Sequence, residues 1–417
     1  MNRGFLIGAA SSGSGKTTLA MGLMRALRNR GLSVQPYKCG PDYIDTMFHH
    51  QATGRDSVNL DTYLASPAHV SMLFRRYGQD ADVRVVEGVM GLYDGYDKAL
   101  GSSAEIAAQL GLPVLLIVNA QSVAYSVAPL IHGFRTFPCA GLGNRPLNIG
   151  GVVFNKVGSE RHYHYLREAC EDAGARCFGY LSRDERLTIP GRHLGLTVAA
   201  QAEMEKVISL AAEEVEQTVD VAGILSLGST QTLPEPTAET HRGTLRIAVA
   251  SDEAFNFVYR ANLDALAQMG KLHRFSPLHD TQLPPCDLLY LPGGYPELYA
   301  GELSANEPMR TAIGRYAESG GRVFAECGGF MYLCRDIDGQ PMCGVFPFSA
   351  SMAGARLHLG YRKIHGATTT ICGHEFHYSH CDGMPDGKAV YRYKNVMAGY
   401  THWYWAETGF EELWKAI

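Results

Sequence analysis

Short apolar runs alternate with amphipathic stretches along this chain of 417 residues, and this alternation is the strongest constraint on its fold. In the first half, the apolar runs predict five buried strands, at residues 5–10, 33–38, 83–87, 114–119 and 151–155. Residues 17–30 predict a helix that ends at Gly31. Val/Ile/Leu runs separated by helical stretches are typical of a parallel sheet covered on both faces.

The alternation is interrupted once and then restarts. Residues 229–242 are polar, contain two prolines and lack hydrophobic periodicity, which is typical of an interdomain linker. After them, strands are predicted at 245–250, 288–291 and 322–325, with a helix at 308–319. We therefore predict two α/β domains, residues 1–228 and 244–417, joined by a linker at 229–243. Ligand sites are expected at the carboxyl ends of the strands.

Charge and cysteine content disfavour several classes of protein. The formal net charge is -5 and the pI about 6.3, so a general affinity for nucleic acid, which needs a basic face, is not expected. Ten cysteines without a C-x-x-C pair fit neither a disulfide scaffold nor a zinc ribbon. The chain shows no signal-peptide layout, and no apolar stretch reaches the ~20 residues of a membrane helix. We therefore expect a cytoplasmic protein without a membrane partner.

The first predicted strand runs into the sequence SSGSGKTT, and the predicted helix follows. This is the setting of a phosphate-binding loop, in which Gly13 and Gly15 let backbone N–H groups turn toward phosphates and Lys16 adds a full positive charge. Thr17 would place its hydroxyl on Mg²⁺. The usual motif has a glycine where this chain has Ala10, so a variant loop is expected. The competing interpretation is a Gly/Ser-rich turn with a surface lysine, which this setting disfavours.

Carboxylates stand at the ends of the next two predicted strands. Asp42 and Asp45 follow the second strand, Glu87 ends the third, and Asp94 comes shortly after it. Carboxylates at adjacent strand ends can hold Mg²⁺ through oxygen ligands, directly or through water. Any one of them alone would more often be a solvated turn acid, but four around one loop favour a metal–nucleotide site.

A second set of candidate residues lies in the second half. Cys327 follows the strand at 322–325 and precedes two glycines, as in a nucleophile elbow. The helix N-terminus there is expected to lower the pKa of the thiol, and the glycine N–H groups can form an oxyanion hole. The nucleophile needs a general base, for which His402, His374 and His377 are candidates that the residue pattern alone does not rank. The alternative interpretation of Cys327 is a small buried thiol.

Seven stretches, in this order, resemble the cobyrinic acid a,c-diamide synthase family: SSGSGKTT, KCGPDYID, EGVMGLYDG, IPGRHLGL, LPGGYPE, ECGGFMYL and GHEFHYS. The resemblance spans residues 8–405, and the ordered set is specific although the phosphate-binding loop alone is not. It implies a two-domain α/β fold. A P-loop NTPase domain with a parallel sheet, similar to dethiobiotin synthetase, is followed by a flavodoxin-like class I glutamine amidotransferase domain. The implied reaction amidates the a and c acetate side chains of a corrin precursor with ATP, Mg²⁺ and glutamine, in cobalamin (vitamin B12) biosynthesis.

The resemblance also implies roles for single residues. Those expected to bind ATP are Gly13, Gly15, Lys16, Thr17 and Thr18. Those expected at Mg²⁺ are Thr17, Asp42 and Glu87. Those expected to bind or activate substrates are Asp42, Tyr43, Ile44, Asp45, Asp94, Gly294 and Gly328, the two glycines through oxyanion N–H groups.

For the amidotransferase reaction, the resemblance implies that Cys327 is the nucleophile and His402 the general base. It places His374 and His377 in a separate motif, near the macrocycle or a domain interface. Related amidotransferases have a glutamate two residues after the base, where this chain has Tyr404. The third member of the triad is therefore absent or supplied from elsewhere.

Alternatives remain open at this point. The same motifs would serve a relative that amidates hydrogenobyrinic acid or nickel sirohydrochlorin. A regulatory P-loop protein, as in partition ATPases, is a further alternative, against which the Cys–His pair argues. The expected partners are a tetrapyrrole polycarboxylate, ATP and glutamine, and a homodimer is the assembly we consider.

Overall fold

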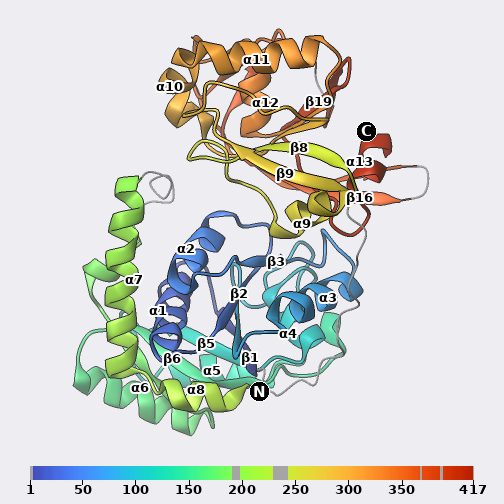
Figure 1. Ribbon diagram of the computed structural model, residues 1–417. Helices are drawn as coiled ribbons and strands as arrows, with labels where there is room; N and C mark the ends of the chain where they lie inside the picture. Colours follow the sequence, from blue (N-terminus) through green and yellow to red (C-terminus); the bar gives the residue numbers. More distant parts are fainter. Residues whose placement is uncertain (1–2, 190–197, 229–242, 367–368, 386–387, 417) are drawn as a thin grey trace. The chain divides into compact units, whose positions relative to one another are not determined.

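The structure is a computed structural model that describes residues 3–189, 198–228, 243–366, 369–385 and 388–416. The chain forms two compact units, Met1–Thr237 and Ala238–Ile417, and each is described by itself (Figure 1). Of the predicted linker at 229–243, only Gly243 lies within the described residues. Of the stretch IPGRHLGL, only Ile189 does.

The first unit is built on a parallel sheet of seven strands in the order β3-β2-β4-β1-β5-β6-β7. The strands are β1 (Arg3–Ala9), β2 (Val34–Cys39), β3 (Val58–Leu60), β4 (Val83–Glu87), β5 (Val114–Asn119), β6 (Ile149–Val157) and β7 (Cys177–Ser182). The five predicted strands are all present, with ends shifted by at most two residues. The prediction lacks β3, which has only three residues, and β7, whose apolar run is interrupted by Gly179.

Helices cover both faces of this sheet (Figure 1). On one face, three helices pack against one another: α1 (Lys16–Asn29), α2 (Ile44–Thr53) and α7 (Val198–Thr218). The remaining helices are α3 (Pro67–Gly78), α4 (Ser103–Leu110), α5 (Val127–Thr136), α6 (Glu160–Asp172) and α8 (Val221–Leu227), with 3-10 turns η1 (Ala140–Leu142) and η2 (Glu185–Leu187). Because crossovers between parallel strands are right-handed, α3 to α6 lie on the face opposite α1.

The second unit contains a six-stranded sheet in the order β18-β19-β11-β10-β8-β9, parallel except for β18. Its strands are β8 (Leu245–Ala250), β9 (Gly270–Phe275), β10 (Leu288–Leu291), β11 (Val323–Glu326), β18 (Tyr391–Tyr393) and β19 (Val396–Gly399). Its helices are α9 (Arg260–Met269), α10 (Ala300–Ala305), α11 (Glu307–Glu318), α12 (Gly328–Leu333) and α13 (Phe410–Ala416), with the 3-10 turn η4 (Pro296–Tyr299). Numbered along the chain, the parallel strands run 2-1-3-4-5, which is the flavodoxin-like order predicted for this domain.

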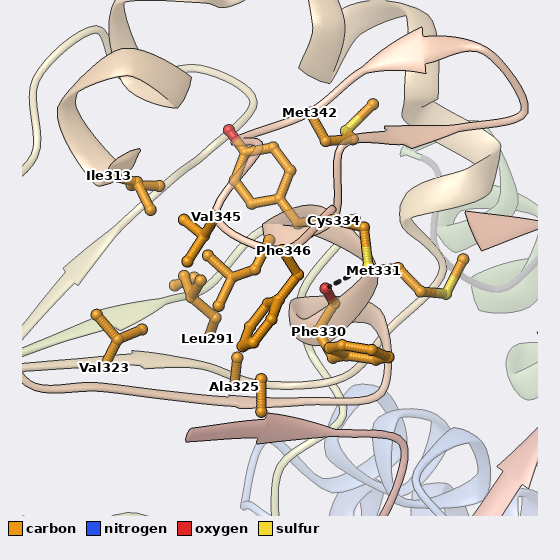
Figure 2. Packing of buried hydrophobic residues seen from close by; sticks show 14 of the residues in the cluster. Leu291, Ile313, Val323, Ala325, Phe330, Met331, Cys334, Met342, Val345 and Phe346 are labelled. Atoms are coloured by element: carbon orange, nitrogen blue, oxygen red, sulfur yellow. Dashed lines mark hydrogen bonds between the residues drawn. The ribbon is translucent and has the colours of Figure 1, made fainter. Parts of the chain in front are cut away.

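Successive residues of the central strands face two different apolar clusters. Leu291 of β10 and Ala325 of β11 pack with residues of α11 and α12 (Figure 2). Tyr290 and Phe324, one position earlier on each strand, belong to a second cluster that includes two buried tryptophans. The alternation follows from the two-residue repeat of a strand. Glu326, the next residue of β11, is therefore directed toward the second cluster.

Two smaller sheets complete the second unit, in the orders β13-β12-β14-β17 and β15-β16-β20. Their strands are β12 (Asp336–Ile337), β13 (Gln340–Pro341), β14 (Ser349–Ser351), β15 (His358–His365), β16 (Thr370–His377), β17 (His380–Asp382) and β20 (His402–Tyr404). The sequence prediction contains none of them, because they are short or carry many polar residues. Within the described residues, no helix is long and apolar enough to cross a membrane.

Candidate active sites

The predicted phosphate-binding loop lies between β1 and α1 of the first unit. Gly13 and Gly15 have positive φ angles, 74° and 97°, which favour glycine. Space is a second reason at Gly15, because a Cβ atom there would lie 2.0 Å from Nδ2 of Asn155. That Nδ2 atom donates a hydrogen bond to the carbonyl oxygen of Ser14 at 2.9 Å. Asn155, a residue of β6, therefore helps to hold the conformation of the phosphate-binding loop.

Lys16, the first residue of α1, is 8% exposed. Its Nζ atom donates hydrogen bonds to the carbonyl oxygens of Met90 at 2.5 Å and Ser11 at 3.3 Å. Burial and the neighbouring ammonium of Lys38 lower its pKa. The side chain lines a pocket of about 540 Å³, which lies in the size range of small-molecule sites. The predicted residues in its lining are Gly13, Gly15, Lys16, Thr17, Thr18, Asp42, Asp45 and Glu87.

The strand register brings an acid–base cluster to this pocket. Lys38 of β2 pairs directly with Glu87 of β4. Nζ of Lys38 donates hydrogen bonds to Oδ2 of Asp45 at 2.5 Å and to Oε1 of Glu87 at 3.0 Å. Oγ1 of Thr17 donates to the same Oε1 atom at 2.7 Å, and Nε2 of His49 lies 2.6 Å from Oε2 of Glu87. Three side chains, from β2, α1 and α2, thus contact the buried carboxylate of Glu87.

Electrostatics favour the charged forms of Lys38 and Glu87 in this cluster. Burial alone would lower the pKa of Lys38, but Asp45 and Glu87 outweigh it and raise that pKa. Burial alone would raise the pKa of Glu87, but Lys38 and His49 outweigh it and lower that pKa. Opposite charges at hydrogen-bond distance favour the ionised forms of both partners. The pocket therefore contains a buried ammonium between two carboxyl groups.

The other predicted substrate residues of this unit have contacts of their own. Oδ1 of Asp42 accepts two backbone N–H bonds, both at 2.9 Å, from the first turn of α2. Tyr43 and Ile44 are only 8% and 9% exposed. Oδ2 of Asp94 accepts a backbone N–H bond at 3.0 Å in the loop after β4, and its charge acts on Lys16. Their roles toward the substrate stay predictions.

In the second unit, Cys327 occupies the turn between β11 and α12. Its φ and ψ angles are 47° and -108°, a strained conformation for a residue other than glycine. Its backbone N–H donates to the carbonyl oxygen of Gly399 at 2.7 Å, which ties the turn to the end of β19. A strained cysteine between a strand and a helix is the arrangement of a nucleophile elbow.

The expected lowering of the thiol pKa is wrong. Burial raises the pKa of Cys327, the carboxyl group of Glu297 adds to this effect, and a backbone hydrogen bond of Gly328 opposes it. Helix α12 has only six residues, so its partial charge is small against the cost of burying a thiolate. Burial therefore favours the thiol form of Cys327, which a base would have to deprotonate for a nucleophilic attack.

Glycine backbones connect the Cys327 turn with His402. A Cβ atom on Gly328 would lie 3.0 Å from the backbone N of Gly294, and one on Gly293 would lie 2.2 Å from Cε1 of His402. The cysteine turn thus packs on the Gly293–Gly294 segment, which packs on the imidazole. Burial and two neighbouring histidines lower the pKa of His402, which leaves the imidazole neutral, as a general base requires.

These neighbours are His374 and His377, which belong to a separate sequence motif. Strand β16 pairs with β20 so that His374 stands opposite His402. The two rings stack, with centroids 5.0 Å apart. Nδ1 of His374 lies 2.8 Å from the hydroxyl of Tyr259. His377 stacks on Tyr400, with centroids 3.8 Å apart.

The sequence prediction does not include Lys38, Asn155 or Glu326, which the structure places in or beside the two sites. For Lys38 and Glu326 a signal exists, because a charged residue in a buried strand is rarely without a partner. Asn155 offers no such signal, since its contact with the loop depends on the order of the strands in the sheet.

A P-loop pocket with an acidic cluster in one unit and a cysteine elbow with a buried imidazole in the other define the class, a nucleotide-using glutamine amidotransferase. Residues 5–196 match the CobQ/CobB/MinD/ParA nucleotide binding domain family, and residues 246–410 match the CobB/CobQ-like glutamine amidotransferase domain family. With the relatives described next, these matches show that the chain belongs to the cobyrinate and hydrogenobyrinate a,c-diamide synthase family.

The relatives match over nearly their whole length. The chain is 39% identical to a cobyrinate a,c-diamide synthase of Salmonella typhimurium, over 95% of this chain and 89% of that protein. It is 39% identical to a hydrogenobyrinate a,c-diamide synthase of Streptomyces coelicolor, over 96% and 94%. It is 41% identical to a cobyrinate a,c-diamide synthase of Syntrophotalea carbinolica, over 91% and 86%. The chain is therefore a ligase with a glutamine amidotransferase domain, which excludes the regulatory P-loop alternative.

Proposed function

We propose that this enzyme amidates the a and c acetate carboxylates of cobyrinic acid, with ATP to activate each carboxylate and glutamine as the nitrogen source. The observation that carries the proposal is one chain with both a P-loop pocket around Lys16 and a buried cysteine elbow at Cys327. Relatives of 39% and 41% identity that are named cobyrinate a,c-diamide synthases support the substrate. Hydrogenobyrinic acid is the second candidate, because relatives of equal identity are named for it.

The first unit would activate the carboxylate. A carboxylate oxygen of the substrate attacks the γ-phosphorus of ATP, ADP leaves, and an acyl phosphate forms. This transfer depends mainly on positioning and on neutralisation of phosphate charge. Lys16 supplies a positive charge at the loop. Lys38 supplies a second positive charge, at hydrogen-bond distance from the carboxyl groups of Asp45 and Glu87. Ammonia then adds to the acyl carbon and phosphate leaves, which gives the amide.

Magnesium fits the oxygen atoms at this pocket. Oγ1 of Thr17 lies 2.7 Å from Oε1 of Glu87 and 3.4 Å from Oδ2 of Asp45. Within the described residues, no group of three or more His, Cys, Asp and Glu residues converges as a metal site. Mg²⁺ needs no such group, because it is usually held by one or two carboxylates together with substrate phosphates and water. We propose Thr17, Asp42 and Glu87 as the residues that hold it, where it would neutralise phosphate charge.

The second unit would release ammonia from glutamine. His402 takes the proton of Cys327 as Sγ attacks the side-chain amide carbon, and the backbone N–H groups of Gly294 and Gly328 would stabilise the oxyanion. The proton passes to the leaving nitrogen, ammonia departs, and a thioester remains. Water hydrolyses the thioester to glutamate and regenerates the thiol.

The experiment that tests the substrate is mass spectrometry of the products from cobyrinic acid, ATP, Mg²⁺ and glutamine. Two sequential exchanges of an acid for an amide, at the a and c side chains, are the expected result. Hydrogenobyrinic acid and nickel sirohydrochlorin are tested in parallel under the same conditions. Faster amidation of either one would identify that macrocycle as the substrate. Intact glutamine hydrolysis without exchange on any of the three would overturn the proposal.

For the base, we expect His402→Ala to lower glutamine-dependent turnover by about 10²–10⁴-fold, the usual contribution of general acid–base catalysis. Amidation with added ammonia should persist, because it bypasses the second unit. Burial lowers the pKa of His402, so the acid limb of kcat/KM for glutamine should lie below the ordinary histidine value of about 6.5. The measurement is glutamate release against pH.

His377→Ala is the matched control, because His377 stacks on Tyr400 instead of His402. It should keep most glutamine-dependent activity. His374→Ala removes the ring stacked on His402 and should give an intermediate rate. If His377→Ala lost glutamine hydrolysis while His402→Ala kept it, the assignment of the base would be reversed.

A further inference from the structure

Glu326 occupies a position between the two candidate catalytic residues of the second unit. It directly precedes Cys327 at the end of β11, and its side chain is directed to the side of the sheet where β20 begins at His402. Its Oε1 atom accepts the backbone N–H of Trp403 at 2.7 Å. One side chain thus connects the residue before the nucleophile with the residue after the base.

The second oxygen of the same carboxyl group is also engaged. The hydroxyl of Tyr290, on the neighbouring strand β10, donates to Oε2 of Glu326 at 2.7 Å. Tyr290 is 1% exposed and Glu326 is 2% exposed. The carboxyl group therefore joins β10, β11 and β20 inside the protein, where hydrogen bonds are costly to leave unmade.

A second feature explains why such a connection is needed. Strand β20 belongs to the small sheet β15-β16-β20 and not to the main sheet that contains β11. Among the described residues, its backbone pairs with β16 and with no strand of the main sheet. The position of His402 relative to Cys327 consequently depends on contacts between two sheets. The hydrogen bond from Trp403 to Glu326 is a direct polar link between them.

We infer that Glu326 is a positioning residue for glutamine hydrolysis, which holds the strand of the general base in register with the cysteine elbow. A glutamate two residues after the base has no counterpart here, since Tyr404 stands there and packs edge-on against Tyr259. Glu326 instead accepts a backbone N–H of the strand that carries His402. This inference rests on the proposed roles of Cys327 and His402.

The ionisation of the carboxyl group agrees with this role. Burial raises the pKa of Glu326 to about 8, against the opposing effects of the Trp403 and Tyr290 hydrogen bonds. Near neutral pH the group is thus largely a neutral acid, which carries one acceptor oxygen and one hydroxyl. A glutamine side chain has the same shape, with one acceptor oxygen and one donor group.

The test compares two variants of equal side-chain length. Glu326→Gln keeps an oxygen that accepts the Trp403 N–H, and its amide N–H can donate to the Tyr290 oxygen once that hydroxyl turns from donor to acceptor. It should therefore keep most of the glutamine-dependent kcat. Glu326→Met fills the same space without an acceptor. We expect it to lose about 100-fold in glutamine-dependent kcat, the size of effect that a displacement of about 1 Å can produce. Its KM for glutamine and its ammonia-dependent amidation should change little.

Unchanged glutamine-dependent kcat in a folded Glu326→Met protein would overturn the inference. A Glu326→Gln protein as slow as Glu326→Met would also overturn it, because the carboxyl group itself would then take part in the chemistry. Thermal unfolding reports whether each variant is folded. If Glu326→Met does not fold, Tyr290→Phe carries the test, since it removes one of the two anchors of the carboxyl group. It should lower the same kcat several-fold, and an unchanged value would refute the inference.

Cys327→Ser in the same assay separates this inference from the proposed function. If Cys327→Ser retains glutamine use, the assignment of the nucleophile fails, whatever the Glu326 variants show. If Cys327→Ser is inactive with glutamine but both Glu326 variants match the wild type, only the positioning role fails.

Discussion

Cys327→Ser is expected to abolish glutamine-dependent amidation, with a fall on the order of 10³-fold or more, while amidation with added ammonia persists. A serine hydroxyl fits the strained turn and its backbone hydrogen bond to Gly399, so the elbow should keep its shape. Near neutral pH, a serine hydroxyl is a far weaker nucleophile than a cysteine thiol. Even the wild-type thiol is held protonated by burial, which makes the step sensitive to the attacking atom.

The measurement is the rate of amide formation with glutamine and with ammonia, together with glutamate release. The ammonia arm shows that the first unit still activates the carboxylate. Near wild-type use of glutamine by Cys327→Ser would show that another residue is the nucleophile. Within the described residues, none of the other nine cysteines forms a disulfide. Cys334 lies seven residues further on, and Cys334→Ser is the matched control, expected to retain glutamine use.

Lys16→Ala should eliminate amidation with either nitrogen source, because both routes need an activated carboxylate. Lys16 is the cation of the phosphate-binding loop, and loss of one such charge at a transferring phosphoryl group costs about 10²–10³-fold or more. Glutamine hydrolysis at Cys327 uses none of these atoms, so basal glutamate release should remain. ADP formation in the presence of the macrocycle and ammonia is the decisive measurement.

Lys156→Ala serves as the control for this variant. Lys156 lines the same pocket, but its Nζ atom lies 3.5 Å from Oε1 of Gln121 and has no contact with the acidic cluster among those described. Its loss should reduce turnover less than tenfold if it only contacts the nucleotide. Ammonia-dependent turnover of Lys16→Ala at saturating ATP would contradict the role of Lys16.

Eight strands of the two main sheets could be predicted from the sequence because they are mainly apolar runs, namely β1, β2, β4, β5, β6, β8, β10 and β11. The prediction lacks β3, β7, β9, β18 and β19. A run such as VLLIVN at β5 is typical of a central strand that is covered on both faces. The loop at Lys16 and the elbow at Cys327 could also be predicted, because each follows such a strand directly. The small strands β15, β16 and β20 could not, since their residues are of mixed polarity and their pairing is between distant segments.

That difference explains why the contact between His374 and His402 could not be predicted. His374 and His402 lie far apart in the sequence, and only the antiparallel pairing of β16 with β20 makes them neighbours. The wrong expectation about the thiol has another origin. A short helix after a cysteine suggests a lowered pKa, but the sequence does not reveal how completely the turn is buried or that Glu297 lies near it. Lys38 is a similar case, because its partner Glu87 is set by strand order.

The close packing of glycines around the cysteine elbow also limits which sequences this enzyme can tolerate. A single methyl group at Gly293 would reach the imidazole of His402, at Gly328 it would lie 2.7 Å from Cδ of Pro296, and at Gly329 it would lie 2.1 Å from the carbonyl oxygen of Leu291. Contacts under 3 Å force neighbouring atoms to move. Alanine, usually the mildest replacement, would therefore act here as an active-site mutation. Steric contacts therefore restrict substitutions at Gly293, Gly328 and Gly329, although glycine has no side chain that could take part in catalysis.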